Sequence, residues 1–171
     1  YSKSNIKIEG IEIEKANIYF KFDDILDFRN HLYYKINKPI YIQKSNFFLV
    51  DKNNKTILIS SLKKIKYLIN KKNNSKELKI TGNIFNINFN SMWKRYYRDP
   101  NNTLNEIKLK NPNLFIKNSF KVVDKLKYKG ISSIDFLNEN ITLNYSVDND
   151  HISIDSPKKN KKQKIKIFSK I

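Results

Sequence analysis

The residue types that carry out most enzyme chemistry are few and scattered in this chain. Its two histidines, His31 and His151, lie far apart, and neither has a histidine or cysteine partner at the spacing of a metal site. Cysteine is absent, which excludes disulfides, thiolate metal sites and a cysteine nucleophile. Gly10, Gly82 and Gly130 are isolated, so the sequence has no glycine-rich phosphate loop.

Asp99, Glu106 and Lys108 are the nearest approach to a catalytic pattern. Two carboxylates and a lysine can hold a divalent ion against a phosphate in metal-dependent nucleases. Here the spacing is tight, and Glu alternating with Lys is what the solvated face of any strand shows. The sequence therefore predicts no enzyme, no metal site and no cofactor.

Aromatic and basic residues are densest between Trp93 and Arg98. Such a patch can stack nucleic-acid bases or lie at a membrane interface, where rings and cations present both apolar and polar ends. The structural interpretation is that these rings cover the open edge of a sheet at the end of a strand. The candidate interface residues are Trp93, Arg95, Tyr96, Tyr97 and Arg98.

The charge is strongly positive, with 34 Lys and Arg against 16 Asp and Glu, a formal net charge of +18 over 171 residues. Positive charge of this size favours phosphate-bearing partners, since each cation placed on a phosphate releases counterions. However, only Arg29, Arg95 and Arg98 are arginines, and specific nucleic-acid recognition favours the planar guanidinium fork. An A/T-rich genome would also enrich Lys, so a basic nucleic-acid-binding protein of the ribosomal type is kept as the alternative function.

The elements that must position these residues are strands, because apolar residues recur at every second position. Polar clusters at residues 51–55, 71–75, 99–102 and 148–150 predict the turns between them, and Ile141–Val147 is expected to pair with Ile152–Asp155 as a hairpin. The apolar alternations are Ile6/Ile8, Ile11/Ile13, Ile18/Phe20/Phe22, Ile40/Ile42, Ile57/Ile59, Leu78/Ile80, Phe85/Ile87/Phe89, Leu104/Ile107/Leu109 (with one slip), Ile141/Leu143/Tyr145/Val147 and Ile152/Ile154.

Three segments fit this pattern less simply. Glu77–Asn90 is long for one strand, and its apolar phase changes near Gly82, which predicts a bulge or bend there. Residues 23–31 predict a short helix behind an acidic N-cap. Residues 60–72 show both helical and strand spacing, which leaves that segment open between the two. Periodicity alone leaves a barrel, a sandwich and an open sheet as possible ways to cover the apolar face.

The stretch Glu77–Lys94, "ELKITGNIFNINFNSMWK", resembles a unit of the AsmA-like family, the group that includes TamB and YhdP. It is followed by "LNEIKLKNPNLFI" at residues 104–116, and the segments at 6–22 and 54–65 are similar in style. The resemblance covers about residues 5–120. These are repeating-β-groove, bridge-like lipid transport proteins.

The resemblance implies a mainly β fold, an antiparallel, curled open sheet forming a U-shaped groove, with one or two short helices. It further implies a periplasmic location in a Gram-negative bacterium, attachment to the inner membrane through a segment outside this chain, and a role in phospholipid transport or outer-membrane biogenesis. Phospholipid is the expected partner. The residues expected to line the groove are Phe85, Ile87, Phe89, Ile107, Leu109, Ile141, Leu143 and Tyr145.

The expected organisation is one β domain over residues 1–157, cut from a longer protein, because the chain begins at Tyr1 rather than Met. Residues 158–171 are expected to form a Lys-rich linker and the start of a further strand. No run of 18 apolar residues and no signal peptide is present. A structural or phage-type β protein with only protein partners is a third possibility that the residues leave open.

Overall fold

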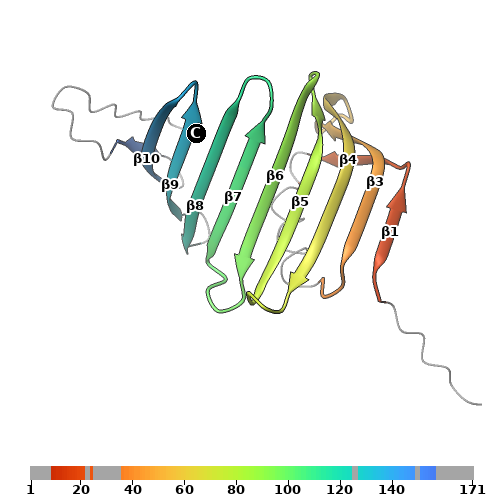
Figure 1. Cartoon of the computed structure of the whole chain (residues 1–171), viewed down its shortest axis with the longest axis horizontal. Helices are drawn as coiled ribbons and strands as arrows, with labels where there is room; N and C mark the ends of the chain where they lie inside the picture. The colour runs from red at the N-terminus through yellow and green to blue at the C-terminus, as the bar shows by residue number, and fades with distance from the viewer. Residues whose placement is uncertain (1–8, 22–23, 25–35, 125–126, 149–150, 157–171) are drawn as a thin grey trace, which may run out of the picture.

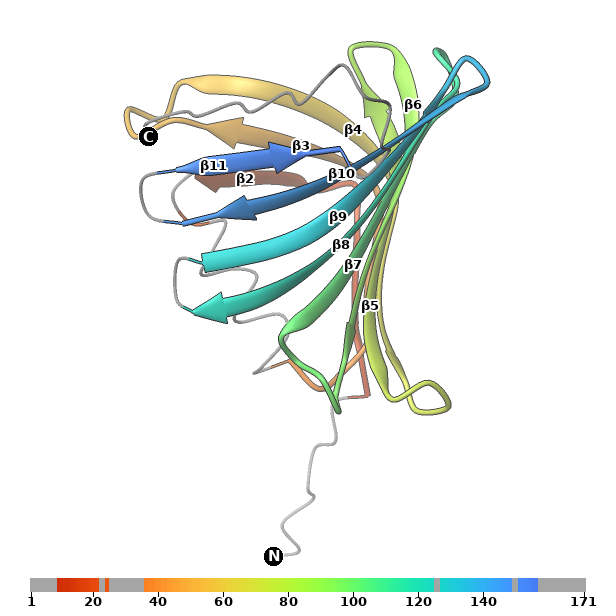
Figure 2. The ribbon, with the colours of Figure 1, turned by 90° about the vertical axis from the view of Figure 1, so that its left-hand side faces the viewer.

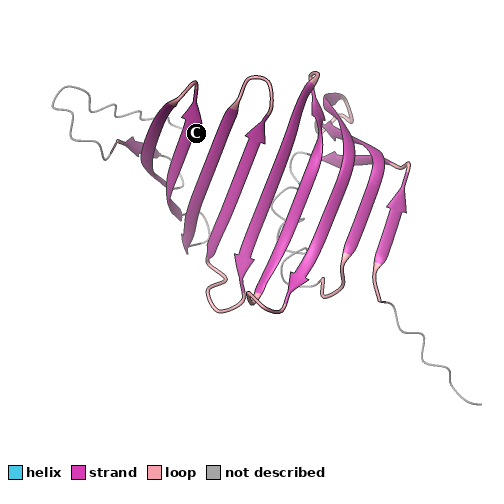
Figure 3. Ribbon diagram, viewed as in Figure 1, coloured by secondary structure: helices cyan, strands magenta, loops and turns pink. Residues whose placement is uncertain are grey.

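The computed structural model describes residues 9–21, 24, 36–124, 127–148 and 151–156. Over these ranges the chain forms a single 11-stranded sheet that does not close on itself, and no α-helix occurs in them (Figures 1 and 3). The predicted mainly β, open and curled sheet is therefore confirmed.

The strands follow one another along the chain with short connections. Nine of them, β3 to β11, form an antiparallel meander in which each strand pairs with its sequence neighbours. The bounds are β1 (Ile11–Glu14), β2 (Asn17–Lys21), β3 (Ile40–Val50), β4 (Thr56–Asn70), β5 (Ser75–Ile84), β6 (Ile87–Tyr96), β7 (Asn102–Leu109), β8 (Leu114–Asp124), β9 (Lys127–Phe136), β10 (Glu139–Val147) and β11 (Ile152–Asp155).

The first two strands share one neighbour. β1 pairs in parallel with the first half of β3, from Ile40 to Gln43, and β2 pairs in parallel with its second half, from Asn46 to Val50. Between them Lys15 has a left-handed backbone (φ 55°), and the Ala16 amide donates to the Ser45 hydroxyl at 3.1 Å. The chain thus turns a corner at this edge of the sheet without leaving β3.

Alternation gives the sheet two unlike faces. One face carries a row of eight isoleucines in direct cross-strand register, interrupted only by Ser91 on β6; we call it the isoleucine row. The other face of the same strands carries mostly Lys, Asn, Ser, Thr and Glu. The row runs across the sheet through Ile13, Ile42, Ile65, Ile80, Ser91, Ile107, Ile116, Ile134 and Ile141.

The sheet curls into a trough (Figure 2). Members of the isoleucine row line the groove, which places the row on the inner face. Irregularities near the middle of β3 and β4 contribute to the bend. Lys44 on β3 has a left-handed backbone (φ 47°), and Lys63 on β4 lies at a shift of register between β4 and β5. A bulge adds twist and bends the strand that carries it. Both bulged residues are lysines, whose side chains tolerate exposure.

Within the described residues, one segment that the sequence left open is now decided, and one sequence-based expectation was wrong. Residues 60–70 belong to strand β4 and are not helical, because the bulge at Lys63 changes an alternating spacing into steps of three that resemble a helix. Glu77–Asn90 is not one bent strand: β5 ends at Ile84, and a two-residue turn, Phe85-Asn86, leads into β6. That turn, and not a bulge near Gly82, changes the apolar phase.

Other expectations fall partly or wholly outside the described ranges. The predicted short helix at 23–31 lies outside them except for Asp24, and the predicted linker at 158–171 lies outside them completely. The predicted turns at 51–55 and 71–75 coincide with the β3–β4 and β4–β5 connections, except that Ser75 already belongs to β5. Of the predicted turn at 148–150, residues 149 and 150 lie outside the described ranges. The predicted hairpin of Ile141–Val147 with Ile152–Asp155 is confirmed by the pairing of Val147 with Ile152.

Two glycines inside the sheet are each covered by an aromatic ring from the directly opposite residue. Gly82 on β5 faces Phe89 on β6, and Gly130 on β9 faces Tyr145 on β10. A Cβ atom at Gly82 would lie 2.6 Å from the Ser61 carbonyl oxygen, and one at Gly130 would lie 2.5 Å from the Tyr145 hydroxyl oxygen. The rings therefore occupy the space that a side chain would need.

We expect Gly82→Ala and Gly130→Ala each to lower the free energy of unfolding by about 1–3 kcal/mol, the usual cost of overpacking. In an unobstructed strand the same change stabilises, by about 0.5–1 kcal/mol. Urea denaturation measures the sign. Gly10→Ala, just before β1, is the comparison with milder crowding, because its Cβ would lie 3.3 Å from the Pro39 carbonyl oxygen. Unchanged or raised stability in both sheet variants would contradict the ring-over-glycine packing.

Candidate functional site

An apolar groove runs along the inside of the curled sheet. Its volume is about 650 Å³, and it is lined by residues from β1 to β7 together with Ile36. The polar side chains in its lining are Ser60, Ser91 and Tyr67. Two of these three hydroxyls are already bonded within the protein, Ser60 to the Asn83 carbonyl at 3.1 Å and Tyr67 to the Ile36 carbonyl at 3.1 Å. The groove offers almost nothing but hydrocarbon.

The groove is open, and its apolar lining is only partly buried. Among the described residues only Val50, Leu62 and Tyr67 are buried hydrophobics. Ile11 and Ile13, which line the groove at the β1 edge, are 46% and 36% exposed. Contiguous apolar surface of this kind is rare on a monomeric protein unless a ligand or partner covers it.

A second hollow, of about 340 Å³, continues the groove towards β11. It shares Ile107 with the first and is otherwise lined by residues of β7 to β11, including Leu143 and Tyr145. The Tyr145 hydroxyl donates to Asn118 Oδ1 at 2.8 Å, and burial raises the pKa of Tyr145, which keeps the hydroxyl protonated as a donor. The apolar inner face therefore extends over most of the sheet, with polar side chains appearing towards β11.

A buried lysine is bonded to Ile36, one of the residues that line the groove. Lys76 on β5 is 4% exposed, and its Nζ donates to the Ile36 carbonyl at 2.9 Å and to Asn37 Oδ1 at 3.2 Å. Burial, followed by the charge of Arg95, lowers the pKa of Lys76. Because Tyr67 binds the same carbonyl, two side chains hold the segment before β3 across the inner face.

The outer face carries an ion cluster around the buried carboxylate of Glu77. The Glu77 carboxylate lies 3.1 Å from Lys79 Nζ and 3.5 Å from Lys94 Nζ, and its Oε1 accepts from the hydroxyl of Ser75 at 3.3 Å. Burial by itself would raise the pKa of Glu77, but the hydrogen bonds and charges of the two lysines outweigh burial and hold the pKa below its ordinary value of 4.5. The cluster joins β5 to β6.

No family model, curated protein or solved structure matches the chain. The function is therefore inferred from the groove and the chemistry of its lining.

The structure places most of the sequence-predicted groove residues on the inner face of the sheet. Phe85, Ile87, Phe89, Ile107 and Leu109 line the main groove. Leu143 and Tyr145 line the second hollow, and Ile141 lies on the same face in the isoleucine row, 52% exposed. The prediction missed all five strands from β1 to β5, whose groove residues include Ile42, Leu62 and Ile65. The alternating isoleucines of these strands could have identified them as part of the groove lining.

The predicted interface patch does not form a single surface. Trp93 and Arg95 lie on the inner face of β6, Tyr96 points to the opposite face, and Tyr97 and Arg98 belong to the β6–β7 connection. Arg95 Nε donates to the Pro100 carbonyl, which ties it to that connection. The side chains of this cluster are therefore divided between two faces and an edge.

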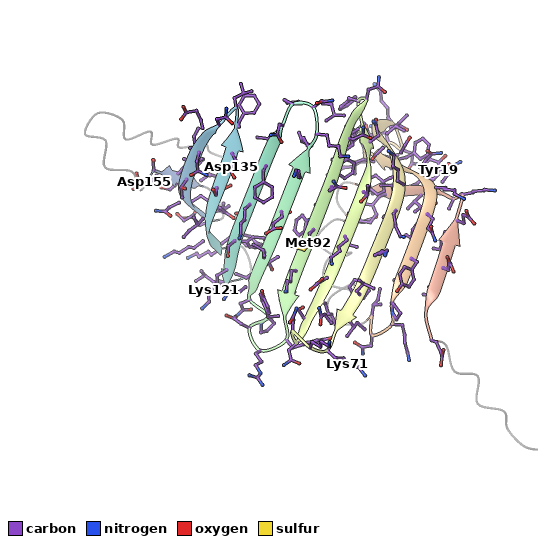
Figure 4. All side chains as sticks on the ribbon, viewed as in Figure 1. Tyr19, Lys71, Met92, Lys121, Asp135 and Asp155 are labelled. Carbon is purple, nitrogen blue, oxygen red and sulfur yellow. The ribbon has the colours of Figure 1, made fainter. Side chains whose placement is uncertain are left out.

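The outer face gives the basic character of the molecule. A hollow of about 540 Å³ near β8 to β11 is lined mostly by polar side chains, including Lys121 and Lys129, which are direct cross-strand partners. Figure 4 shows Lys121 and Lys71 towards one edge of the sheet and Asp135 towards the other. Within the described ranges, no three His, Asp or Glu side chains gather as a metal site would require, and no helix there is long and apolar enough to cross a membrane.

Proposed function

We propose that this chain is a non-enzymatic lipid-binding segment that shields phospholipid acyl chains along its concave face. The observation that carries the proposal is the isoleucine row along an open groove whose lining, among the described residues, is almost entirely hydrocarbon. The buried Lys76 is already engaged with Ile36 and Asn37.

The lining selects for hydrocarbon by exclusion. A sugar, nucleotide or peptide placed there would lose hydrogen bonds to water without replacement, at a cost of about 1–3 kcal/mol for each unpaired group. An acyl chain loses none and gains about 0.8 kcal/mol per buried methylene, before the costs of ordering. Since no polar contact fixes its position, a chain can slide along the groove.

The wider role follows the resemblance to AsmA-like proteins. Among the described strands, β1, β2 and β11 pair on one side only, so further strands can extend the same sheet and lengthen the groove. We propose that such a continued groove serves phospholipid transport between membranes, or outer-membrane biogenesis, in the periplasm. The chain would be attached to the inner membrane by a segment outside this sequence.

Ser91 provides the sharpest test, because it is the one gap in the isoleucine row and lies between Ile80 and Ile107. Ser91→Trp fills the groove without introducing a charge. We expect it to weaken phospholipid retention at least tenfold, roughly the effect of displacing two methylenes. The measurement is mass spectrometry of lipid extracted from protein purified in about 1 M salt, which strips electrostatic passengers.

Asn90→Trp is the matched control, since the neighbouring residue on β6 is exposed and points to the outer face. It adds the same ring and should retain lipid as the wild type does. Equal retention by both variants, or wild-type protein that carries no lipid, would contradict the proposal. Nucleic acid that co-purifies and is shed only by the salt wash would favour the basic outer face as the functional surface instead.

A further inference from the structure

Two hairpin turns have an unusual residue at their first position. β5–β6 is joined by Phe85-Asn86 and β9–β10 by Leu137-Asn138, and all four residues have positive φ: 49° and 63° in the first turn, 48° and 67° in the second. Both are two-residue turns with the left-handed backbone of type I′. Asn tolerates that conformation, whereas a bulky Phe or Leu is a strained outlier in it.

The strained side chains gain little from the fold. Phe85 is 77% exposed and Leu137 is 71% exposed, the two highest values among the exposed large hydrophobics of the described residues. An Asn or Gly at either position would relieve the backbone and remove an apolar side chain from water. Strain that the folded protein does not need is often found where a side chain meets a ligand or partner.

Both turns lie on the same edge of the sheet. The meander places the β5–β6, β7–β8 and β9–β10 turns together at one end of the strands, the upper edge in Figure 1. Four strand spacings separate Phe85 from Leu137, a distance of about 19 Å along the sheet. Between them lies the exposed β7–β8 turn with Lys110. Because the edge consists of turns, adding a strand to β1, β2 or β11 would not cover it.

We propose that this edge docks on a lipid bilayer by inserting Phe85 and Leu137 into the interface. Two apolar tips separated by a polar turn do not make the contiguous patch that a protein partner needs, whereas a bilayer accepts separate wedges. Phe85 also lines the groove, so insertion would place the groove opening against the membrane. The edge carries both Lys110 and Glu139, so apolar insertion rather than charge holds it there.

The test combines two readouts on one pair of substitutions. Phe85→Asn with Leu137→Asn should reduce co-flotation with phosphatidylethanolamine–phosphatidylglycerol vesicles at least about tenfold in partition coefficient. Flotation is run in about 0.5 M NaCl, where adsorption through the basic surface is screened. The same variant should raise the midpoint of thermal unfolding, by roughly 2–4 °C for each relaxed turn.

Asn86→Gly with Asn138→Gly is the matched control, since it changes the same turns but leaves both apolar tips, and it should float as the wild type does. Wild-type protein that does not float in high salt, tip variants that float normally, or tip variants that unfold more easily would each overturn the proposal. So would a tip variant whose only change is its oligomeric state. Leu137→Asn alone separates this inference from the proposed function, because Leu137 does not line the groove: it should lose flotation and keep retained phospholipid.

Discussion

Glu77→Gln is expected to lower the free energy of unfolding by about 3 kcal/mol, the size of effect seen when one partner of a buried ion pair is removed. The Glu77 side chain is only 8% exposed and faces Lys94, which is 16% exposed. Glutamine keeps the shape and can still accept from Ser75, but it leaves the Lys94 charge without its counter-charge. Urea denaturation at neutral pH measures the loss.

The direction of the Glu77 pKa shift predicts how its contribution to stability changes with pH. The folded-state pKa of Glu77 lies below its ordinary value of 4.5, so the carboxylate stabilises the fold at pH values above 4.5. That contribution is lost as the pH falls through the lowered folded-state pKa, because the carboxylate is then protonated in both states. The stability difference between wild type and Glu77→Gln should therefore be full at pH 7 and shrink steadily below pH 4.5.

Glu106→Gln is the control for this experiment. Glu106 also pairs with a lysine, Lys117, at 3.8 Å, but the two side chains are 27% and 53% exposed. Exposed pairs of this kind contribute about 0–1 kcal/mol. If the two glutamine variants lose the same stability, the Glu77 cluster does not act as a buried ion pair.

The sequence predicted the type of fold because strand periodicity survives in single sequences. Alternation identified the apolar face, and polar clusters such as residues 51–55 and 71–75 identified turns correctly. Turns built from Phe85-Asn86 and Leu137-Asn138 were missed, since neither contains Gly and Phe and Leu are poor turn formers. At both turns, the pairing of the flanking strands outweighs the poor turn propensity of Phe and Leu.

The candidate groove was predictable only strand by strand. Apolar positions on β6 and β10 were recognised because their alternation is uninterrupted, as at Ile87 and Phe89. On β4 the bulge at Lys63 shifts the pattern by one residue, so Leu62 and Ile65 resembled one face of a helix. The isoleucine row across the strands depends on register, which bulges and turn lengths determine and which local periodicity does not contain.

Removing bound lipid is expected to destabilise the protein, because no second layer of described residues packs on the apolar face of the sheet. Only three hydrophobic side chains are buried among the described residues, and the groove lining otherwise faces an open volume of about 650 Å³. A lipid that binds only the folded state adds about 2.7 kcal/mol at a concentration one hundred times its Kd. For a chain of this size that corresponds to roughly 5–11 °C in the midpoint of thermal unfolding.

The measurement compares protein stripped by a hydrophobic resin with the same protein after phospholipid is added back, using calorimetry and the fluorescence of a dye that binds exposed apolar surface. Stripped wild type should melt earlier and bind more dye, and added phospholipid should reverse both changes. Ser91→Trp should respond weakly, since its indole already occupies the gap between Ile80 and Ile107. If phospholipid leaves the unfolding midpoint of the wild type unchanged, the apolar face is covered by protein. That result would contradict the proposal that an acyl chain covers it.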